Sequence, residues 1–396
     1  MPRFRRTKYL FVYCEDRQLL DIASLLRGQA VSAPLRQILA ISILTGKEQP
    51  ISRAELDLLL SVPSDEWIER DGEEAHTLGQ LALRGLVLCD APDDRLQELR
   101  RGDEVLSSSQ WNVYAALYHF LTKWRDVDID LPGDPPDLQE LEVDATAAFI
   151  RAYGLPPPHF HAVADPLAVT ALPLVKREGG LWETLARRRT TRAFAPVPLS
   201  VEELSLVLRY TFGCRGYSRV ADGVTVLSKT SPSGGAMHPT EVYVLARDVE
   251  GVEPGLYHYG AERHQLELLA RLAPDEAGSL AIEFSSGQPF VGDAPALFLL
   301  TARFYRSFWK YRRHRRAYAV LLMDAAHLTQ TFYLVCAELG LGAFVTAAVN
   351  GANIEERLGL DPFTEGALAM CGCGKPAAQQ EIDVDFEPYV PRETRI

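Results

Sequence analysis

Apolar and polar positions in the second half of the chain alternate between helical and extended spacing. Residues 181–187 show helical spacing, as does the segment 204–212, which follows a capping box formed by Ser200 and Glu203. The longest apolar segment, 318–339, is apolar on nearly all faces and predicts a helix buried within the domain or between subunits. Short runs typical of strands lie at 241–246, 255–259, 295–301 and 343–349. Because the strand spacings are irregular, the pattern favours an α+β fold over a doubly wound parallel sheet.

The first 125 residues follow a different pattern. A β-branched and aromatic run at 7–14 suits a strand, whereas the segment 35–44 carries apolar residues at helical spacing. A second capping box, Ser52 with Glu55, predicts a helix that runs to residue 60. The other predicted elements here are helices at 18–27, 73–84 and 111–124 and a strand at 86–89.

Helix, capped helix, helix and strand is the order of a winged helix-turn-helix, so we expect a winged-helix-like domain at residues 1–125. Such domains often bind DNA through the third helix. Here that helix begins with Asp71, Glu73 and Glu74, and it has few cations to meet phosphates. A peptide-binding or purely structural role is therefore favoured over DNA binding.

Residues 126–173 are rich in aspartate and proline and predict a linker. Proline lacks an N–H group and restricts the residue before it, so regular helices and strands are disfavoured there. The chain is therefore expected to consist of a winged-helix-like domain at 1–125, a linker at 126–173 and a larger domain at 174–396.

Composition narrows the classes of function. The chain has 396 residues and a formal net charge of −12, which works against binding to nucleic acid. No apolar run reaches the roughly 20 residues that span a bilayer, and the run after the basic start is too short for a signal peptide. Six scattered cysteines suit reduced core thiols. We expect a cytoplasmic protein with no nucleic-acid or membrane partner.

The segment Arg187-Arg188-Arg189-Thr190-Thr191-Arg192 is the first candidate for chemistry. A guanidinium binds a phosphate monoester through two hydrogen bonds, and hydroxyls fill the remaining acceptor positions. The segment therefore predicts a clamp for an anionic group, with Arg188, Thr190 and Arg192 as the main candidates. A solvated basic turn is the alternative, and Arg187 fits the end of the preceding helix.

The second candidate is the loop 230–239, Thr-Ser-Pro-Ser-Gly-Gly-Ala-Met-His-Pro, just before a predicted strand. Glycines allow the backbone to approach a flat ligand and to offer N–H groups to it. An ordinary turn explains the composition equally well. Ser233 has no recognisable base partner, so hydrolase chemistry is unsupported.

The third candidate is Lys310-Tyr311, followed by four arginines within residues 312–316. Neighbouring cations acidify a phenol or make an amine less basic, and either group then serves as an acid or base near neutral pH. A solvated helix face is the alternative. The histidines show no metal-ligand spacing, and the Cys371-Gly-Cys373 pair has no second pair to complete a metal site.

In this order and spacing the three candidates resemble the nitroreductase-like flavoproteins, specifically the SagB-type peptide dehydrogenases. The resemblance covers about residues 170–376 and includes Gly255-Leu-Tyr-His-Tyr259 and Leu339-Gly-Leu-Gly-Ala343. It implies an α/β/α sandwich with a mostly antiparallel central sheet, and an FMN-dependent homodimer with both flavins at the subunit interface. The branch usually carries an amino-terminal winged-helix-like domain that helps to recognise a precursor peptide.

The resemblance also implies roles for individual residues. Arg188, Arg189, Thr190 and Arg192 fall where the family holds the FMN phosphate and ribityl chain, with Lys375 as a second phosphate cation. Pro232, Ser233 and Gly234 match the loop that meets the flavin ring across the dimer. Ala347-Ala348 stand where the broader superfamily often has Glu-Gly against the flavin N5 edge. Lys310 and Tyr311 match the acid–base pair of azoline oxidation.

The expected function is oxidation of a thiazoline or oxazoline in a ribosomally made peptide to a thiazole or oxazole. The resemblance implies a precursor peptide, whose leader the first domain binds, and a cyclodehydratase as partners. Three alternatives stay open: a general nitro- or quinone reductase using NAD(P)H, a non-catalytic scaffold that binds the precursor peptide, and another desaturation or reduction of a peptide.

Overall fold

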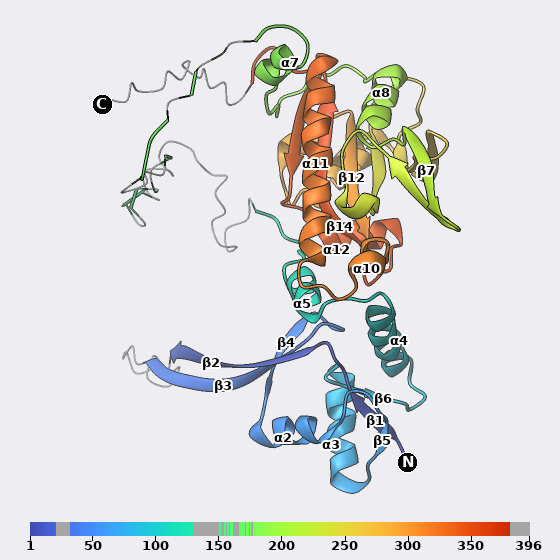
Figure 1. Cartoon of the computed structure of the whole chain (residues 1–396). Coiled ribbons are helices and arrows are strands. Elements are labelled where there is room, and N and C mark those ends of the chain that lie inside the picture. Colours follow the sequence, from blue (N-terminus) through green and yellow to red (C-terminus); the bar gives the residue numbers. More distant parts are fainter. Residues whose placement is uncertain are drawn as a thin grey trace.

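The protein consists of two lobes that are joined at a narrow waist (Figure 1). The computed structural model describes residues 1–20, 32–129 and 177–380, together with short pieces between residues 150 and 175. The smaller lobe is built from the amino-terminal residues and the larger lobe from the carboxyl-terminal residues. Most of the predicted linker lies outside the described residues, so the boundaries of the three parts stay a prediction.

A six-stranded sheet forms the centre of the larger lobe, with the strand order β11-β10-β9-β12-β14-β13. Every neighbouring pair in it is antiparallel. The strands are β9 (Thr240–Ala246), β10 (Gly255–Gly260), β11 (Gln265–Arg271), β12 (Ala296–Arg303), β13 (Gly342–Thr346) and β14 (Glu365–Gly374). The strands expected near 241–246, 255–259, 295–301 and 343–349 are thereby confirmed, and β11 and β14 are additional.

Helices cover both faces of this sheet. On one face, α8 (Val201–Thr211) and α11 (Ala317–Glu338) share a core with the sheet strands. On the other face, α9 (Pro274–Phe284), the short 3-10 helix η2 (Pro289–Asp293) and α12 (Gly351–Leu358) form a second core. Helix, sheet and helix are thus stacked in three layers, and the expected α+β sandwich with an antiparallel centre is confirmed.

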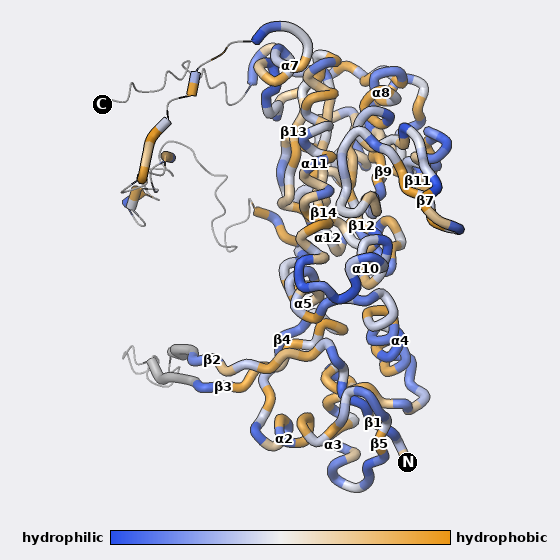
Figure 2. The backbone as a smooth tube through the Cα atoms, in the orientation of Figure 1, coloured by the Kyte–Doolittle hydropathy of each residue, from blue (hydrophilic) through white to orange (hydrophobic). Residues whose placement is uncertain are grey.

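Helix α11 is buried along one face, and not on nearly all faces as its apolar sequence predicted. Leu328 and Phe332 pack on the sheet, whereas Leu322 and Met323 are 40% and 55% exposed. By length and composition the helix could cross a membrane. Of its most apolar 18-residue stretch, 33% is buried inside the structure. A hydrophilic segment precedes it, between α10 (Phe304–Tyr311) and α11 (Figure 2).

The smaller lobe contains two three-stranded sheets, β5-β1-β6 and β2-β3-β4. Helix α2 (Arg53–Ser61) begins at the predicted capping box, in which Ser52 and Glu55 exchange hydrogen bonds. The other helices are α3 (Gly72–Leu83), α4 (Asp94–Ser108) and α5 (Val113–Leu121). The strands are β1 (Arg3–Arg6), β2 (Leu10–Leu20), β3 (Ser32–Ser42), β4 (Lys47–Ile51), β5 (Ile68–Glu69) and β6 (Val87–Cys89).

The helix expected at 35–44 is wrong, because these residues belong largely to strand β3, which pairs with β2 and β4. Leu39, Ala40 and Ile41 are all buried, so both faces of the strand are apolar. A strand buried on both faces has the same apolar run as a helix, and periodicity cannot separate them. The helix expected at 18–27 is also wrong over residues 18–20, which end strand β2, and its remainder lies outside the described residues.

The two lobes share an aromatic cluster at the waist. Trp111 of the smaller lobe packs between Phe304 and Phe308 of α10, with ring centroids 4.6 and 4.9 Å away. Its indole N–H donates to the Phe363 carbonyl at 3.1 Å. Below the cluster, Lys123 pairs with the buried Glu355 at 2.7 Å. These contacts hold the residues on either side of α5 against α10 and α12, and Tyr311 packs against the same aromatic cluster, so the smaller lobe lies close to Tyr311.

Candidate functional site

The arginine–threonine turn, residues 188–192, connects helix α7 (Leu181–Arg187) to the edge of the central sheet. Thr190 forms a parallel bridge with Ala343 of β13, and the Thr191 N–H donates to the Ala343 carbonyl at 2.8 Å. A Cβ atom on Gly342 would lie 2.5 Å from the Thr191 side chain, so only glycine fits there. The turn is therefore fixed to the start of β13.

A pocket of 570 Å³ opens beside this turn and is lined by all its residues and by Tyr333 of α11. The Arg188 guanidinium lies over the Tyr333 ring, 5.4 Å from its centroid, and Arg192 lies over Phe290 at 5.8 Å. Within the described part of the chain, neither has an acidic partner. Arg187, in contrast, pairs with Glu338 at 3.1 Å. The turn thus presents uncompensated positive charge to the pocket.

Two other predicted residues of the clamp make local contacts. The Arg189 guanidinium donates to the carbonyls of Ala186 and Arg188, at 2.8 and 3.0 Å. Lys375 pairs with Glu203 of the α8 capping box and does not line the pocket. Burial acts to raise the pKa of Glu203, but hydrogen bonds from Lys375 and Ser200 outweigh it and lower that pKa. The role of Lys375 as a second phosphate cation stays a prediction.

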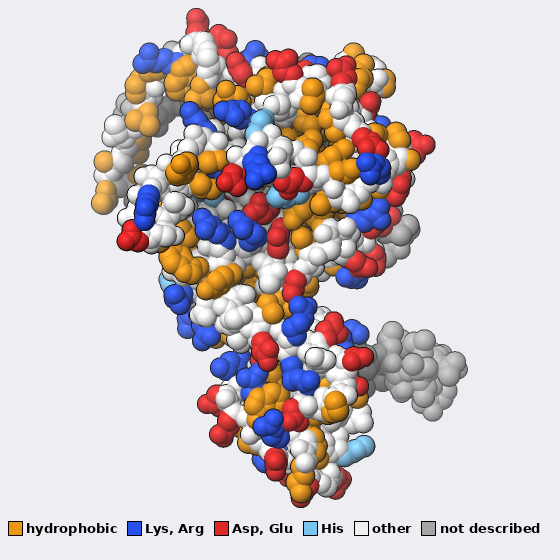
Figure 3. Space-filling model, turned by 90° about the vertical axis from the view of Figure 1, so that its right-hand side faces the viewer, with side chains coloured by type: hydrophobic (Ala, Val, Ile, Leu, Met, Phe, Trp, Pro, Cys, Tyr) orange, Lys and Arg blue, Asp and Glu red, His pale blue; other side chains and the backbone are white. Residues whose placement is uncertain are grey.

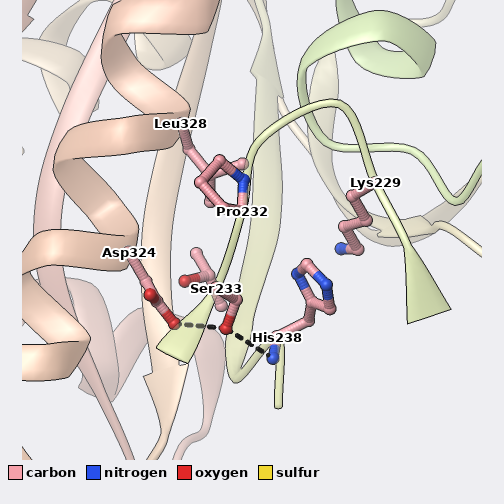
Figure 4. A pocket seen from close by; sticks show the side chains of 7 residues that line it. Lys229, Pro232, Ser233, His238, Asp324 and Leu328 are labelled. Carbon is pink, nitrogen blue, oxygen red and sulfur yellow. Dashed lines mark hydrogen bonds between the residues drawn. The ribbon is translucent and has the colours of Figure 1, made fainter. Parts of the chain in front are cut away.

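The serine–glycine loop, residues 230–239, lies between the hairpin strand β8 (Val224–Ser228) and β9. Asp324, a buried residue of α11, accepts hydrogen bonds from the Ser233 hydroxyl at 2.6 Å and from the Gly234 N–H at 2.9 Å. The Ser233 hydroxyl accepts in turn from the His238 N–H at 2.9 Å (Figure 4). One carboxylate of α11 therefore fixes the shape of the loop.

Three residues of this loop have positive φ angles: Gly235 at 60°, Ala236 at 58° and His238 at 46°. Left-handed backbone conformations at residues other than glycine are costly, and they cluster where surrounding contacts hold a functional loop. Here the hydrogen bonds to Asp324 of α11, and the hydrogen bond from Arg306 of α10 to a loop carbonyl at 2.8 Å, hold the backbone. The loop is thus fastened to two helices.

Lys310 and Tyr311 lie in the last turn of α10 and contact the same loop. The Lys310 ammonium donates to the Gly235 carbonyl at 3.3 Å. A Cβ atom on Gly234 would lie 3.3 Å from the Tyr311 hydroxyl, so this glycine and the phenol are close neighbours. The structure therefore brings two of the three sequence-predicted groups together, although 75 residues separate Lys310 from Gly235.

The arginine–threonine turn lies elsewhere in the same chain. Helix α7 is near one end of α11 and helix α10 near the other (Figure 1). The turn contacts α11 at Tyr333, whereas the loop contacts α11 along its length, from Asp324 to Thr331. The pocket beside the turn and the two pockets beside the loop share no lining residue.

Ala347 and Ala348 follow the carboxyl end of β13, the strand whose start holds the arginine–threonine turn. The Ala348 carbonyl accepts from the Gln288 side chain at 3.3 Å. Ala347 lines a second pocket of 480 Å³ between α5 and α11. Strand β13 thus connects the cationic turn at one end to two residues with small side chains, Ala347 and Ala348, at the other.

Comparison with known proteins places this geometry in a family. The Nitroreductase family model matches residues 185–375, which include every one of the predicted site residues. A Methanocaldococcus jannaschii protein, Putative nitroreductase MJ1384, is 32% identical over 186 residues, which are 46% of this chain and 86% of that protein. The chain belongs to the nitroreductase family.

Two further similarities concern peptide-processing proteins. The Trifolitoxin-processing protein TfxB of Rhizobium leguminosarum bv. trifolii is 35% identical over 182 residues, 44% of this chain and 48% of that protein. The chain thus spans about half the length of this relative. A chain of the E. coli Microcin synthetase McbBCD complex with truncated pro-MccB17 bound is 20% identical, with a TM-score of 0.49 over 69% of this chain and 94% of that one.

The nitroreductase domain also contains a charged cluster that the sequence interpretation missed. Glu241 of β9 accepts from Arg303 at 2.6 Å and lies 3.5 Å from His258, which is 2.8 Å from Glu267. His258 belongs to the segment Gly255-Leu-Tyr-His-Tyr259 quoted for the resemblance, and Glu241 closely follows the serine–glycine loop. This position within or next to a quoted segment is the sequence signal that could have identified the two residues.

His258 should make the stability of the nitroreductase domain depend on pH. Hydrogen bonding to Glu241, and then to Glu267, raises the pKa of His258 to about 9, although burial acts against it. Because this pKa exceeds the ordinary 6.5, the stabilisation is complete below pH 6.5 and is lost as the pH rises to about 9. We expect the free energy of unfolding to fall by on the order of 1 kcal/mol over this window, after allowance for solvent screening.

Urea unfolding of the wild type and of His258→Gln, each at the two ends of the window, measures this effect. The difference between the two proteins should shrink as the pH rises, since other titrating groups affect both alike. Parallel pH dependences in the two proteins would show that protonated His258 contributes nothing.

Proposed function

We propose that the protein is an FMN-dependent dehydrogenase that matures a ribosomally made peptide by oxidising a thiazoline or oxazoline to the aromatic azole. The observation that carries the proposal is the contact of Lys310 and Tyr311 with the serine–glycine loop. In this contact an acid–base pair adjoins the loop that the resemblance assigns to the flavin. Membership of the nitroreductase family, whose members are flavoprotein oxidoreductases, supports the redox part.

The residues present fit FMN. Arg188 and Arg192 present guanidinium groups that have no acidic partner among the described residues, and Thr190 adds a hydroxyl, as a phosphate monoester requires. Ala347 and Ala348 lie at the other end of β13, roughly 13 Å along the strand from Ala343. An elongated molecule with an anionic end and a flat, uncharged end suits this arrangement. When bound, FMN supplies a two-electron acceptor that takes a hydride.

The chemistry assigned to this chain is proton removal and orientation. In an azoline ring, the proton on Cα is acidic because it adjoins an imine and a carbonyl. Tyr311 or Lys310 would remove this proton, and bound FMN would accept the hydride that the ring CH2 gives up, so that the ring becomes aromatic. Dioxygen would serve as the oxidant of the reduced cofactor. The rigid loop held by Asp324 fixes the position of Lys310 through the Gly235 carbonyl.

A homodimer would complete this site. The arginine–threonine turn and the serine–glycine loop line different pockets, so in this proposal the turn of one subunit and the loop of its partner hold the same flavin. The exposed apolar residues Leu322 and Met323 of α11 support such a contact between subunits.

The peptide substrate is supported by the 35% identity to the Trifolitoxin-processing protein TfxB. In the proposal, the winged-helix-like lobe binds the leader of a precursor peptide, and a cyclodehydratase supplies the azoline. The protein acts in the cytoplasm, without a nucleic-acid or membrane partner. A reduction or another desaturation of the same peptide would use the same residues.

The experiment begins with the purified protein and its absorbance spectrum, with and without added FMN. A flavin spectrum that persists after removal of free FMN is expected, and its absence would end the flavoprotein proposal. A synthetic peptide that contains one thiazoline should then lose two hydrogen atoms under air, which mass spectrometry detects.

The second candidate is a general nitro- or quinone reductase, which the similarity to Putative nitroreductase MJ1384 favours. Steady oxidation of NAD(P)H by a nitroaromatic compound, with the thiazoline peptide unchanged, would establish it in place of the first. Flavin binding with neither activity would instead favour a peptide-binding scaffold.

A further inference from the structure

A cavity of 950 Å³ adjoins the serine–glycine loop on the side of the β7–β8 hairpin, where β7 is Gly216–Ala221. A smaller hollow, lined by Pro232 and Ser233, shares Lys229, His238 and Thr240 with it. Figure 4 shows the Lys229 amine directed toward the His238 ring, on the side of the loop away from Asp324. The cavity therefore opens beside the loop that the proposed function places at the flavin.

Four of the eight charged groups that line this cavity are already paired. Arg303 and His258 share the Glu241 carboxylate, and His258 also contacts Glu267. Arg215 and Arg263 are exposed at the rim. Five cations and three carboxylates face the cavity, so positive charge is in excess in a chain whose net charge is −12. The cations are Arg215, Lys229, His258, Arg263 and Arg303, and the carboxylates are Glu241, Glu262 and Glu267.

Lys229 differs from the other interior cations. Its side chain is half-buried, and among the described residues its ammonium group has no hydrogen-bond or ion-pair partner. Burial lowers the pKa of Lys229, with Glu241 acting against that shift. An ammonium group without a partner in a partly desolvated cavity is stabilised by an anion that enters and binds it.

We propose that this cavity binds a carboxylate of the substrate peptide, with Lys229 as its direct partner. The inference rests on the proposed function, because it makes the cavity the part of the substrate site that holds the residues next to the oxidised ring. A peptide carboxylate fits better than a phosphate: the cavity interior offers one free ammonium, and the wall carboxylates repel a dianion.

The hairpin above the cavity suits an extended peptide. Strands β7 and β8 pair only with each other within the described residues, so each has a free edge that can accept a further strand. Tyr217 and Val220 are 79% and 59% exposed on this hairpin, and they offer apolar contacts beside the edge. Charged and histidine side chains lie together on this face of the larger lobe (Figure 3). The cavity at Lys229 and the free edge of the hairpin would thus hold one continuous segment of the substrate peptide.

The experiment measures binding of dansyl-Gly-Gly-Gly, as the free acid and as its carboxyl-terminal amide, by fluorescence anisotropy with the full chain loaded with FMN. The acid should bind more tightly than the amide. In Lys229→Gln the acid should bind about tenfold more weakly, the effect of losing one hydrogen bond to a charged group, and the amide should be unaffected. Lys229→Arg should restore the preference for the acid.

Arg219→Gln is the matched control, because it removes the same charge from the hairpin that directly precedes Lys229. Arg219 pairs with Asp222 at 2.7 Å and does not line the cavity, so binding of both peptides should stay unchanged. An unfolding temperature and an FMN content equal to those of the wild type show that a variant is correctly folded. Dansyl-Gly-Asp-Gly-amide, compared with its asparagine counterpart, tests whether a side-chain carboxylate rather than a terminal one is bound.

Equal binding of acid and amide by the wild type would overturn the inference, as would an unchanged preference in Lys229→Gln. Displacement of the acid by inorganic phosphate at lower concentration than by acetate would assign the cavity to a phosphoryl group instead. These measurements involve no turnover. A carboxylate preference without azoline oxidation would leave the cavity standing and remove the proposed reaction alone.

Discussion

Lys310→Ala and Tyr311→Phe are each expected to lower the rate of azoline oxidation by at least about 100-fold, while FMN stays bound. The rate should fall because both side chains, in the last turn of α10, contact the serine–glycine loop. Lys310 donates to the carbonyl of Gly235, and the Tyr311 hydroxyl lies close to the backbone of Gly234. No other pair of titratable groups on the described residues contacts that loop from α10. The rates would be measured with the thiazoline peptide under air, by mass spectrometry.

A loss of rate in Lys310→Ala could also arise from a loosened loop, because Lys310 donates to the Gly235 carbonyl. Lys310→Arg separates the two roles. It can keep the hydrogen bond to the carbonyl, but a guanidinium does not titrate near neutral pH. If Lys310 moves a proton, Lys310→Arg stays slow and loses the wild-type pH profile. If Lys310 only positions the loop, Lys310→Arg regains most of the rate.

Arg315→Ala is the matched control for both substitutions. Arg315 belongs to the same basic segment, but it lies over the Tyr114 ring of the smaller lobe, 5.8 Å from its centroid. Its removal should change the oxidation rate less than about twofold, in the range of surface substitutions. Full activity in both Lys310→Ala and Tyr311→Phe would remove this pair from the chemistry and favour a different base.

Local signals in the sequence were sufficient to predict where the two capped helices begin. Ser52 with Glu55 and Ser200 with Glu203 form reciprocal hydrogen bonds that depend on four adjacent residues alone, and both helices begin there. Strand β3 shows the opposite case. Its identity depends on pairing with β2 and β4, and its burial on both faces produces an apolar run without a period of two.

The residues of the candidate site could likewise be predicted only in part. The residue types at 188–192, 230–239 and 310–311 could be identified from the sequence because their chemistry is local. Their spatial relations could not, since the Lys310 contact with Gly235 and the Lys375 pair with Glu203 join residues far apart in the chain. Lys229 was missed because a single lysine in a loop has no distinguishing sequence pattern. Only the structure shows that Lys229 faces a cavity and that its ammonium group has no ion-pair partner among the described residues.

The second large effect is expected at the arginine–threonine turn. Arg188→Ala and Arg192→Ala should each weaken FMN binding by about 10- to 100-fold, the cost of losing charge-assisted hydrogen bonds to a phosphate. Both guanidinium groups lie over aromatic rings rather than beside carboxylates, so they are free to bind an anion without breaking an ion pair. Quenching of flavin fluorescence on titration with apoprotein gives the dissociation constant.

Riboflavin, which lacks the phosphate, makes this test specific for the clamp. The two substitutions should leave riboflavin affinity nearly unchanged, because Ala347 and the loop, which are proposed to hold the flavin ring, are untouched. Arg187→Ala is the matched control: Arg187 pairs with Glu338 at 3.1 Å, so its loss should affect FMN affinity far less. An equal loss of FMN and riboflavin affinity would show that the turn supports the fold of the pocket instead of binding the phosphate. An unchanged FMN affinity in both variants would place the phosphate elsewhere, with Lys375 as the next residue to replace.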